Sequence, residues 1–303
     1  MNENAKATVL AVLAAALYAV MTPISKVLQA GVPPVLEASL LYLGAGIGMA
    51  CLMCADKARG HVADRPSLDR TDLRYVAAMV VLDMAAPILL MLGLAHCLPQ
   101  TVSLLNNFEI VATTVIAVVL FHEHVSRLLA CAIAIITCAC ALLSLDGAES
   151  LSLSAGALLV LGACVCWGFE NNCTASLSEK DTRQVVLVKG LGSGAGSLAV
   201  SLLAGEGGAP AGSCVAMMLL GFLSVGLSVY CYVIAQASLG AARTSAFYAT
   251  SPFIGAFLGM LLFREMPGPL FWVAFALMAC GVGLSVRDAI GEESTPGSTQ
   301  PVS

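Results

Sequence analysis

The sequence consists largely of ten apolar runs, each about as long as a helix that crosses a bilayer. Such a helix needs about 20 apolar residues, whereas a strand of an outer-membrane barrel needs about 10 residues that alternate in polarity. Only 11% of the residues are charged, against about 25% in soluble domains. The chain is therefore predicted to be an all-α integral membrane protein, with transmembrane helices over residues 8–29, 33–54, 74–96, 99–121, 127–145, 152–176, 184–204, 213–237, 241–263 and 267–286.

Lysine and arginine residues predict the orientation of these helices. The loop between the second and third helices holds the densest basic cluster of the chain, namely Lys57, Arg59, Arg65, Arg70 and Arg74. Basic loops favour the cytoplasmic side, and placing this loop there puts both termini in the cytoplasm. Of the other lysine and arginine residues in or near loops, only Lys26 and Arg264 then fall on the opposite side.

The two halves of the chain resemble each other. A shift of 142 residues superimposes Leu-Phe-His-Glu at 120–123 on Leu-Phe-Arg-Glu at 262–265. Because five helices per unit is an odd number, the second copy must be inverted in the membrane. We expect two inverted five-helix repeats at 1–146 and 147–287, followed by a disordered cytoplasmic tail at 288–303. Inverted repeats are typical of secondary transporters, in which rocking of the halves gives alternating access.

Four segments resemble motifs of EamA-type proteins in the drug/metabolite transporter superfamily. They are Leu-Met-Leu-Gly-Leu-Ala-His at 90–96, Phe-His-Glu-His at 121–124, Cys-Trp-Gly-Phe-Glu-Asn-Asn at 166–172 and Gly-Ala-Ala-Arg-Thr at 240–244. The resemblance implies a bacterial inner-membrane protein in which two inverted units enclose a central cavity, lined mainly by helices one, three, four, six, eight and nine. It implies a small-molecule substrate without identifying it, and a homodimer stays open.

A carboxylate near the middle of the fourth helix is the leading functional candidate. Glu109 lies in a run with no other charge, together with Asn106 and Asn107. A charge at that depth is costly and normally faces a protein interior or a wet cavity. Burial favours the neutral form of a carboxyl, which suits a proton carrier, so a coupling or substrate-amine site is expected. The alternative is a structural carboxyl bonded to a neighbouring helix.

The sixth and seventh helices carry opposite charges at matching depth. Glu170 and Lys189 each lie ten residues from the turn near Lys180. An ion pair would neutralise both side chains in a low-dielectric setting and join the two helices. A substrate-facing role for Trp167, Glu170 and Asn171 is the other interpretation.

Other polar groups allow two interpretations each. Asp83, one turn before Pro87, either faces the cavity or bonds locally at a kink, and Glu37 is expected to cap or to be solvated near the start of the second helix. Arg243 either attracts an anionic substrate or simply belongs to the excess of basic residues on the cytoplasmic side. Helices eight and nine carry further polar side chains, some of which are expected to line the cavity, namely Tyr230, Tyr232, Gln236 and Tyr248.

Prolines and glycines predict breaks and close contacts. Pro23, Pro87 and Pro252 are expected to interrupt helices one, three and nine, since proline frees a backbone carbonyl. A kink without a break is the alternative at each position. The pairs Gly44/Gly48, Gly192/Gly196 and Gly255/Gly259 predict close helix packing.

No motif indicates an enzyme. The twelve cysteines lie mostly inside apolar runs, and His122-Glu123-His124 has no third ligand nearby. The sequence predicts no metal, no cofactor, no catalytic residue and no nucleic-acid partner. The leading interpretation is a secondary active exporter or exchanger of a small organic solute, with proton coupling left open. The alternative is a non-transporting scaffold or partner subunit that retains the fold.

Overall fold

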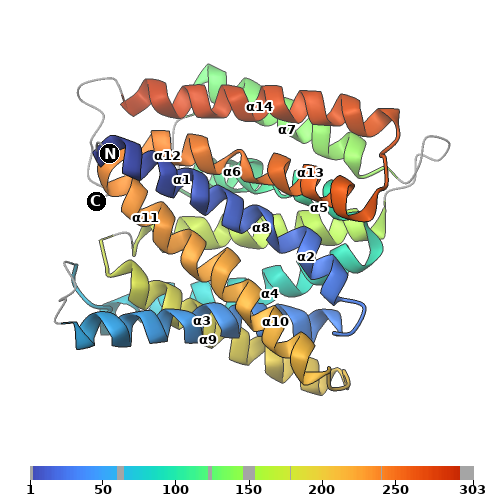
Figure 1. Cartoon of the computed structure of the whole chain (residues 1–303). Coiled ribbons are helices and arrows are strands. Elements are labelled where there is room, and N and C mark those ends of the chain that lie inside the picture. The colour runs from blue at the N-terminus through green and yellow to red at the C-terminus, as the bar shows by residue number, and fades with distance from the viewer. Residues whose placement is uncertain are drawn as a thin grey trace.

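The computed structural model describes residues 3–59, 65–121, 125–145, 154–177, 179–239 and 241–293, and in these ranges every regular element is a helix. Ten helical passes follow one another, some of them in two or three pieces (Figure 1). In chain order they are α1 (Glu3–Ala19) with α2 (Met21–Leu28); α3 (Pro34–Ala58); η1 (Arg70–Asp72) with α4 (Leu73–His96); α5 (Pro99–Leu105) with α6 (Phe108–Phe121); α7 (Arg127–Leu143); α8 (Ala155–Ala175); α9 (Thr182–Leu203); α10 (Ala211–Gly221), η2 (Phe222–Leu227) and α11 (Ser228–Leu239); α12 (Ala241–Tyr248) with α13 (Ser251–Phe263); and α14 (Pro269–Glu293).

The outer surface of these helices suits a bilayer. Within the described residues, eight helical stretches are long and apolar enough to cross a membrane, and α7 is a shorter apolar helix of 17 residues. Large apolar side chains are exposed on the outside, for example Val119 at 63% and Leu261 at 66%. The protein is therefore an all-helical membrane protein, as the apolar runs predict.

The C-terminal tail differs in part from the predicted disorder. Helix α14 continues to Glu293, so residues 288–293 of the predicted disordered tail are helical. The remaining tail and the His122-Glu123-His124 segment lie outside the described residues.

Three of the passes are broken near their middle, and local chemistry explains each break. A proline ring clashes with the carbonyl four residues earlier; accordingly, α1 ends at Ala19, four residues before Pro23, and α12 ends at Tyr248, four residues before Pro252. The pass formed by α5 and α6 breaks at Asn106 and Asn107, where the Asn107 side chain donates to the Leu104 carbonyl at 3.1 Å. Asparagine side chains compete in this way with the backbone ladder.

The interruption predicted at Pro87 does not occur, and an unpredicted irregularity is present elsewhere. Helix α4 runs without interruption through Pro87. Instead, the eighth pass contains a π-helical segment at Phe222–Leu227, a geometry that often marks functional sites.

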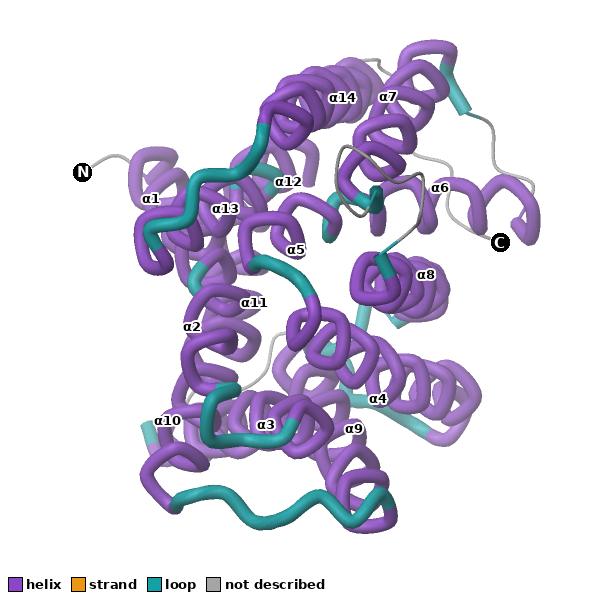
Figure 2. The backbone as a smooth tube through the Cα atoms, turned by 90° about the vertical axis from the view of Figure 1, so that its right-hand side faces the viewer, coloured by secondary structure: helices purple, strands orange, loops and turns teal. Residues whose placement is uncertain are grey.

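The helices pack in pairs that relate the two halves. The second, fourth and fifth passes contact the seventh, ninth and tenth (α3 with α9, α5 with α13, α7 with α14). The first pass contacts the eighth through α1 and α11, while the third contacts the sixth through α4 and α8. If each pass of one half is replaced by the corresponding pass of the other half, the same set of contacts results, so the two halves pack in equivalent ways. Figure 2 looks along the bundle, with α7 and α14 at one edge and α3, α9 and α10 at the other.

Glycines allow the closest of these contacts. A Cβ on Gly44 of α3 would lie 2.0 Å from the Met218 carbonyl oxygen, and a Cβ on Gly221 of α10 would lie 1.9 Å from the Leu41 carbonyl oxygen. Backbone meets backbone at both points, so no side-chain movement could make room. Packing is thus the role of Gly44, as its spacing with Gly48 predicts.

A surface ion-pair cluster joins two loops at one end of the bundle. Lys180, between α8 and α9, lies 2.9 Å from Asp69 and 2.8 Å from Asp72. The hydrogen bond from Lys180, helped by bonds from Thr71, holds the pKa of Asp69 well below its usual range. The turn between α8 and α9 is therefore attached to the start of α4.

Candidate functional site

A cavity of about 670 Å³ lies inside the bundle, between helices of both halves. Its apolar lining includes Leu90 and Met91 of α4, Ile110 of α6 and Val225 and Val229 of the eighth pass. Its polar lining comprises Tyr18, Tyr42, Asn106, Asn107, Glu109, Trp167, Glu170, Asn171, Thr174, Lys189, Tyr232, Tyr248, Ser251 and Ser285.

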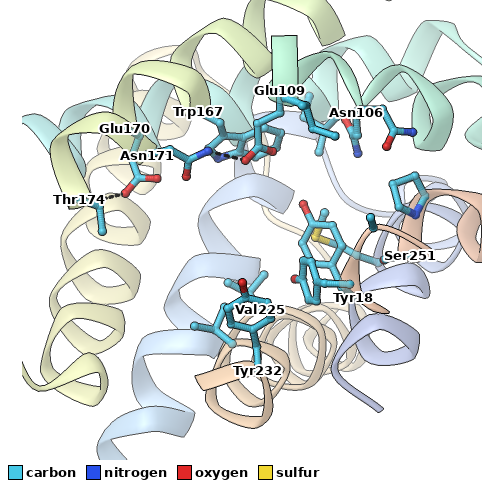
Figure 3. Close-up of a pocket in the computed structure, with 18 of the residues that line it drawn as sticks. Tyr18, Asn106, Glu109, Trp167, Glu170, Asn171, Thr174, Val225, Tyr232 and Ser251 are labelled. Carbon is cyan, nitrogen blue, oxygen red and sulfur yellow. Dashed lines mark hydrogen bonds between the residues drawn. The ribbon is translucent and has the colours of Figure 1, made fainter. Parts of the chain in front are cut away.

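Glu109 projects into this cavity from the first turn of α6, directly after the break at Asn106 and Asn107 (Figure 3). Asn171 of α8 donates its amide to Glu109 Oε1 at 2.7 Å and also contacts Thr113 Oγ1 at 3.2 Å. Among the described residues, no partner bonds to Glu109 Oε2. The carboxylate is thus held in place through one oxygen, while the other is available to a proton or a solute.

Lys189 of α9 is surrounded by two carboxylates. Its Nζ lies 2.9 Å from Asp83 Oδ2 and 3.2 Å from Glu170 Oε1. Thr174 donates its hydroxyl to Glu170 Oε1 from one turn further along α8. Asp83 and Glu170 are 0% and 2% exposed, so this ion cluster is closed to bulk solvent on its acidic side.

Asp83 sits behind the cavity wall rather than on it. Two lining residues donate to its Oδ1: Tyr42 through its hydroxyl at 3.1 Å and Trp167 through its indole nitrogen at 3.2 Å. With Lys189 on Oδ2, Asp83 connects α3, α4, α8 and α9. Trp167 therefore presents its ring to the cavity while its nitrogen is anchored in the wall.

Three tyrosines form a cluster on another side of the cavity. The ring of Tyr248 lies 5.4 Å from that of Tyr18 and 5.2 Å from that of Tyr232, measured between ring centroids. These rings come from α12, α1 and α11, near the breaks of the first and ninth passes. Figure 3 shows Tyr18 and Tyr232 across the cavity from Glu109.

The structure brings together most of the candidates that the sequence indicates. Those that line the cavity are Asn106, Asn107, Glu109, Trp167, Glu170, Asn171 and Tyr248. Of the two candidates on α11, Tyr232 lines the cavity and Tyr230 does not. Arg243 belongs to α12, but its side chain lies outside the described part of the structure.

Several lining residues are not predicted from the sequence. Tyr18 and Tyr42 carry no charge in long apolar runs, and Thr174 and Ser251 are common helix residues. The one available signal is their distance from the breaks: Tyr18 lies five residues before Pro23, and Ser251 directly precedes Pro252.

Glu37 differs from its expected role near the start of α3. It is 0% exposed and neither carboxylate oxygen has a hydrogen-bond partner among the described residues. The α3 N-terminus is instead satisfied by Glu206, which accepts from the backbone nitrogens of Val35 at 3.1 Å and Leu36 at 2.8 Å. The prediction of a capping or solvated Glu37 is therefore wrong, because Glu206 occupies that position.

The described residues contain no group of three or more His, Cys, Asp or Glu side chains that could hold a metal ion.

Comparisons with known proteins agree with this architecture. A crystal structure titled "Crystal structure of protein" matches with a TM-score of 0.68 and 18% identity, over 95% of this chain and 98% of that one. At that identity the likeness shows the fold alone. No curated protein matches the sequence.

A family-level match is more informative. The model of the EamA-like transporter family matches twice, over residues 5–145 and 154–287, so each half of the chain corresponds to one copy. This family consists of transporters rather than enzymes, and membership implies passage of a solute across the bilayer. The chain therefore belongs to the EamA-like transporter family, within the drug/metabolite transporter superfamily.

Proposed function

We propose that the protein is a secondary active exporter or exchanger that carries a small organic solute through the central cavity, with Glu109 as the group at which proton and solute binding are coupled. The observation that carries this proposal is the environment of Glu109. One of its oxygens is held by Asn171, and the other faces a 670 Å³ cavity without a protein partner among the described residues. A carboxyl in that position can accept either a proton or a cationic group of the solute.

The shape of the cavity supports alternating access. Its lining extends to Thr174 near the end of α8 and to Ala289 near the end of α14. Toward the other end of the bundle α5 and α13 are in close contact, because a Cβ on Gly255 would lie 2.9 Å from Ser103 Oγ and one on Gly259 would lie 3.1 Å from the Gln100 nitrogen. These observations support a cavity that is entered from one end while the α5–α13 contact closes the other.

The basic-residue asymmetry assigns the open end to the cytoplasm. Thr174 and Ala289 lie on the side of the α8–α9 turn and the α14 C-terminal end, which the distribution of Lys and Arg places inside a bacterial cell. An exporter would load its solute from this side and release it after α5 and α13 separate.

The test compares cells that produce wild-type protein with cells that produce Glu109→Gln, by profiling metabolites inside the cells and in the medium. Glutamine keeps the shape of the side chain and can still contact Asn171, but it cannot titrate. We expect at least one solute to accumulate in the medium with wild type and to be retained with Glu109→Gln. Glu265→Gln is the matched control, since Glu265 is exposed outside the cavity. Identical profiles for all three proteins at equal membrane abundance would refute the proposal.

A further inference from the structure

We propose that the solute is an organic ammonium ion, whose cationic group binds between Glu109 and the tyrosine cluster of Tyr18, Tyr232 and Tyr248. This assignment of substrate class rests on the proposed transport function. It follows from the charges of the cavity, the position of the rings and the apolar remainder of the lining.

The charge balance of the cavity is negative. Its charged lining among the described residues is Glu109, Glu170 and Lys189, and Asp83 lies directly behind the wall. The one cation in this set, Lys189, is already within 3.2 Å of both Glu170 and Asp83. An anionic solute would have to compete with two carboxylates for Lys189, and it would also enter the field of Glu109.

Glu109 is the carboxylate that remains available. Asp83 accepts from Tyr42, Trp167 and Lys189, and Glu170 accepts from Thr174 and Lys189. Glu109 accepts only from the neutral amide of Asn171 among the described residues. A primary or quaternary ammonium group would supply the counter-charge that this side chain lacks.

The rings across the cavity suit the same group. Tyrosine faces attract cations within about 6 Å, and the attraction grows when water is excluded. The three rings lie within 5.4 Å of their neighbours, from Tyr18 to Tyr248 and from Tyr248 to Tyr232. They are contributed by three different helical segments, so a cation between them and Glu109 would contact both repeats.

The rest of the lining sets the size and polarity of the solute. The cavity falls within the range of about 300–1,000 Å³ that is typical for small organic ligands, and Leu90, Met91, Ile110 and Val225 provide apolar contacts. The structure therefore favours a monocation with an apolar body over a sugar or a nucleotide.

The chain contains its own reporter for binding. It has two tryptophans, Trp167 in the cavity wall and Trp272 on the outer surface at 43% exposure. In a Trp272→Phe background, emission reports on Trp167 alone. The purified protein would be titrated with phenethylamine, 2-phenylethanol and phenylacetate, which share a phenyl ring and differ in charge.

We expect phenethylamine to shift the Trp167 emission with an affinity at least about tenfold higher than that of the alcohol or the acid. Glu109→Gln should weaken phenethylamine binding by about tenfold or more, while Glu265→Gln leaves it unchanged. Tyr248→Phe keeps the ring and should retain binding, whereas Tyr248→Leu should weaken it. The two Tyr248 variants keep the test decisive even if Glu109→Gln fails to fold.

Two results would overturn the ammonium assignment in different ways. If phenylacetate or phenylethanol binds as tightly as phenethylamine, the substrate class is wrong while a solute-binding cavity stands. If none of the three probes alters the emission, the class is wrong, and the metabolite comparison with Glu109→Gln decides independently whether the transport proposal also fails.

Discussion

Replacing Lys189 by methionine should be among the most destabilising single changes in this protein. The substitution leaves Asp83 and Glu170, at 0% and 2% exposure, without the cation they share at 2.9 and 3.2 Å. With an effective dielectric constant of about 20, each of these contacts contributes roughly 5 kcal/mol of Coulomb attraction before desolvation is subtracted. Removing one partner of a buried pair costs about 3–5 kcal/mol in measured cases.

The loss can be expressed as a change in thermal midpoint. At about 2–4 °C per kcal/mol, a loss of about 3–5 kcal/mol lowers the thermal midpoint by about 6–20 °C.

The assay is thermal: detergent-solubilised protein is heated, and the monodisperse fraction is measured by size-exclusion chromatography. Glu170→Gln alone should change the thermal midpoint only slightly, because Lys189 still forms its ion pair with Asp83. The Glu170→Gln/Lys189→Met double variant should recover only part of the loss, since Asp83 stays unpaired, and adding Asp83→Asn should recover most of it.

Lys180→Met is the matched control, because Lys180 also has two acidic partners but lies in a surface loop, where ion pairs contribute little. If Lys189→Met melts within a few degrees of Lys180→Met, or if the triple variant is less stable than Lys189→Met, the ion cluster does not stabilise the bundle as the distances indicate.

Three further predictions use other parts of the bundle. Gly44→Ala should abolish folded yield because its Cβ would lie 2.0 Å from a backbone oxygen, whereas Gly212→Ala, with open space around it, should fold normally; equal yields would refute the close α3–α10 contact. Glu37→Met should raise the thermal midpoint, because it replaces a buried carboxyl whose oxygens have no hydrogen-bond partner among the described residues by an apolar side chain of similar size. Glu206→Gln should lower that midpoint, since Glu206 accepts from Val35, Leu36 and Ser201, and the opposite pattern would be inconsistent with these contacts. Reporter fusions after Arg65 and Arg287 should read cytoplasmic and one after Gly207 periplasmic, and a cytoplasmic signal at Gly207 would refute the proposed orientation.

The helical passes could be predicted because length and polarity alone decide whether a segment can cross a bilayer. Breaks at Pro23 and Pro252 follow from proline chemistry, yet Pro87 leaves α4 unbroken. The presence of a proline therefore does not by itself predict a break. The break at Asn106 and Asn107 depends on a side-chain bond to Leu104 that no spacing rule predicts.

The site was less predictable because it depends on how helices rotate and pair. The equal distance of Lys189 and Glu170 from the turn between their helices predicts that they pair. The closer partner of Lys189 is Asp83 of α4, however, and the sequence does not predict that α4 lies beside α9. Tyr232 rather than Tyr230 faces the cavity. The π-helical segment at Phe222–Leu227 changes the rotation per residue along the eighth pass. Regular α-helical periodicity therefore does not predict which residues of α11 face the cavity.

The most direct test of coupling at Glu109 is a proton flux in reconstituted vesicles that enclose a pH-sensitive dye. Phenyltrimethylammonium is added outside, because its permanent charge prevents it from crossing the lipid unaided. If protein-bound proton and cation alternate at Glu109, entry of the cation releases protons from the lumen, and the lumen should become alkaline with wild type and with Glu265→Gln but not with Glu109→Gln. Alkalinisation by Glu109→Gln at the wild-type rate would contradict the assignment of Glu109 as the coupling group.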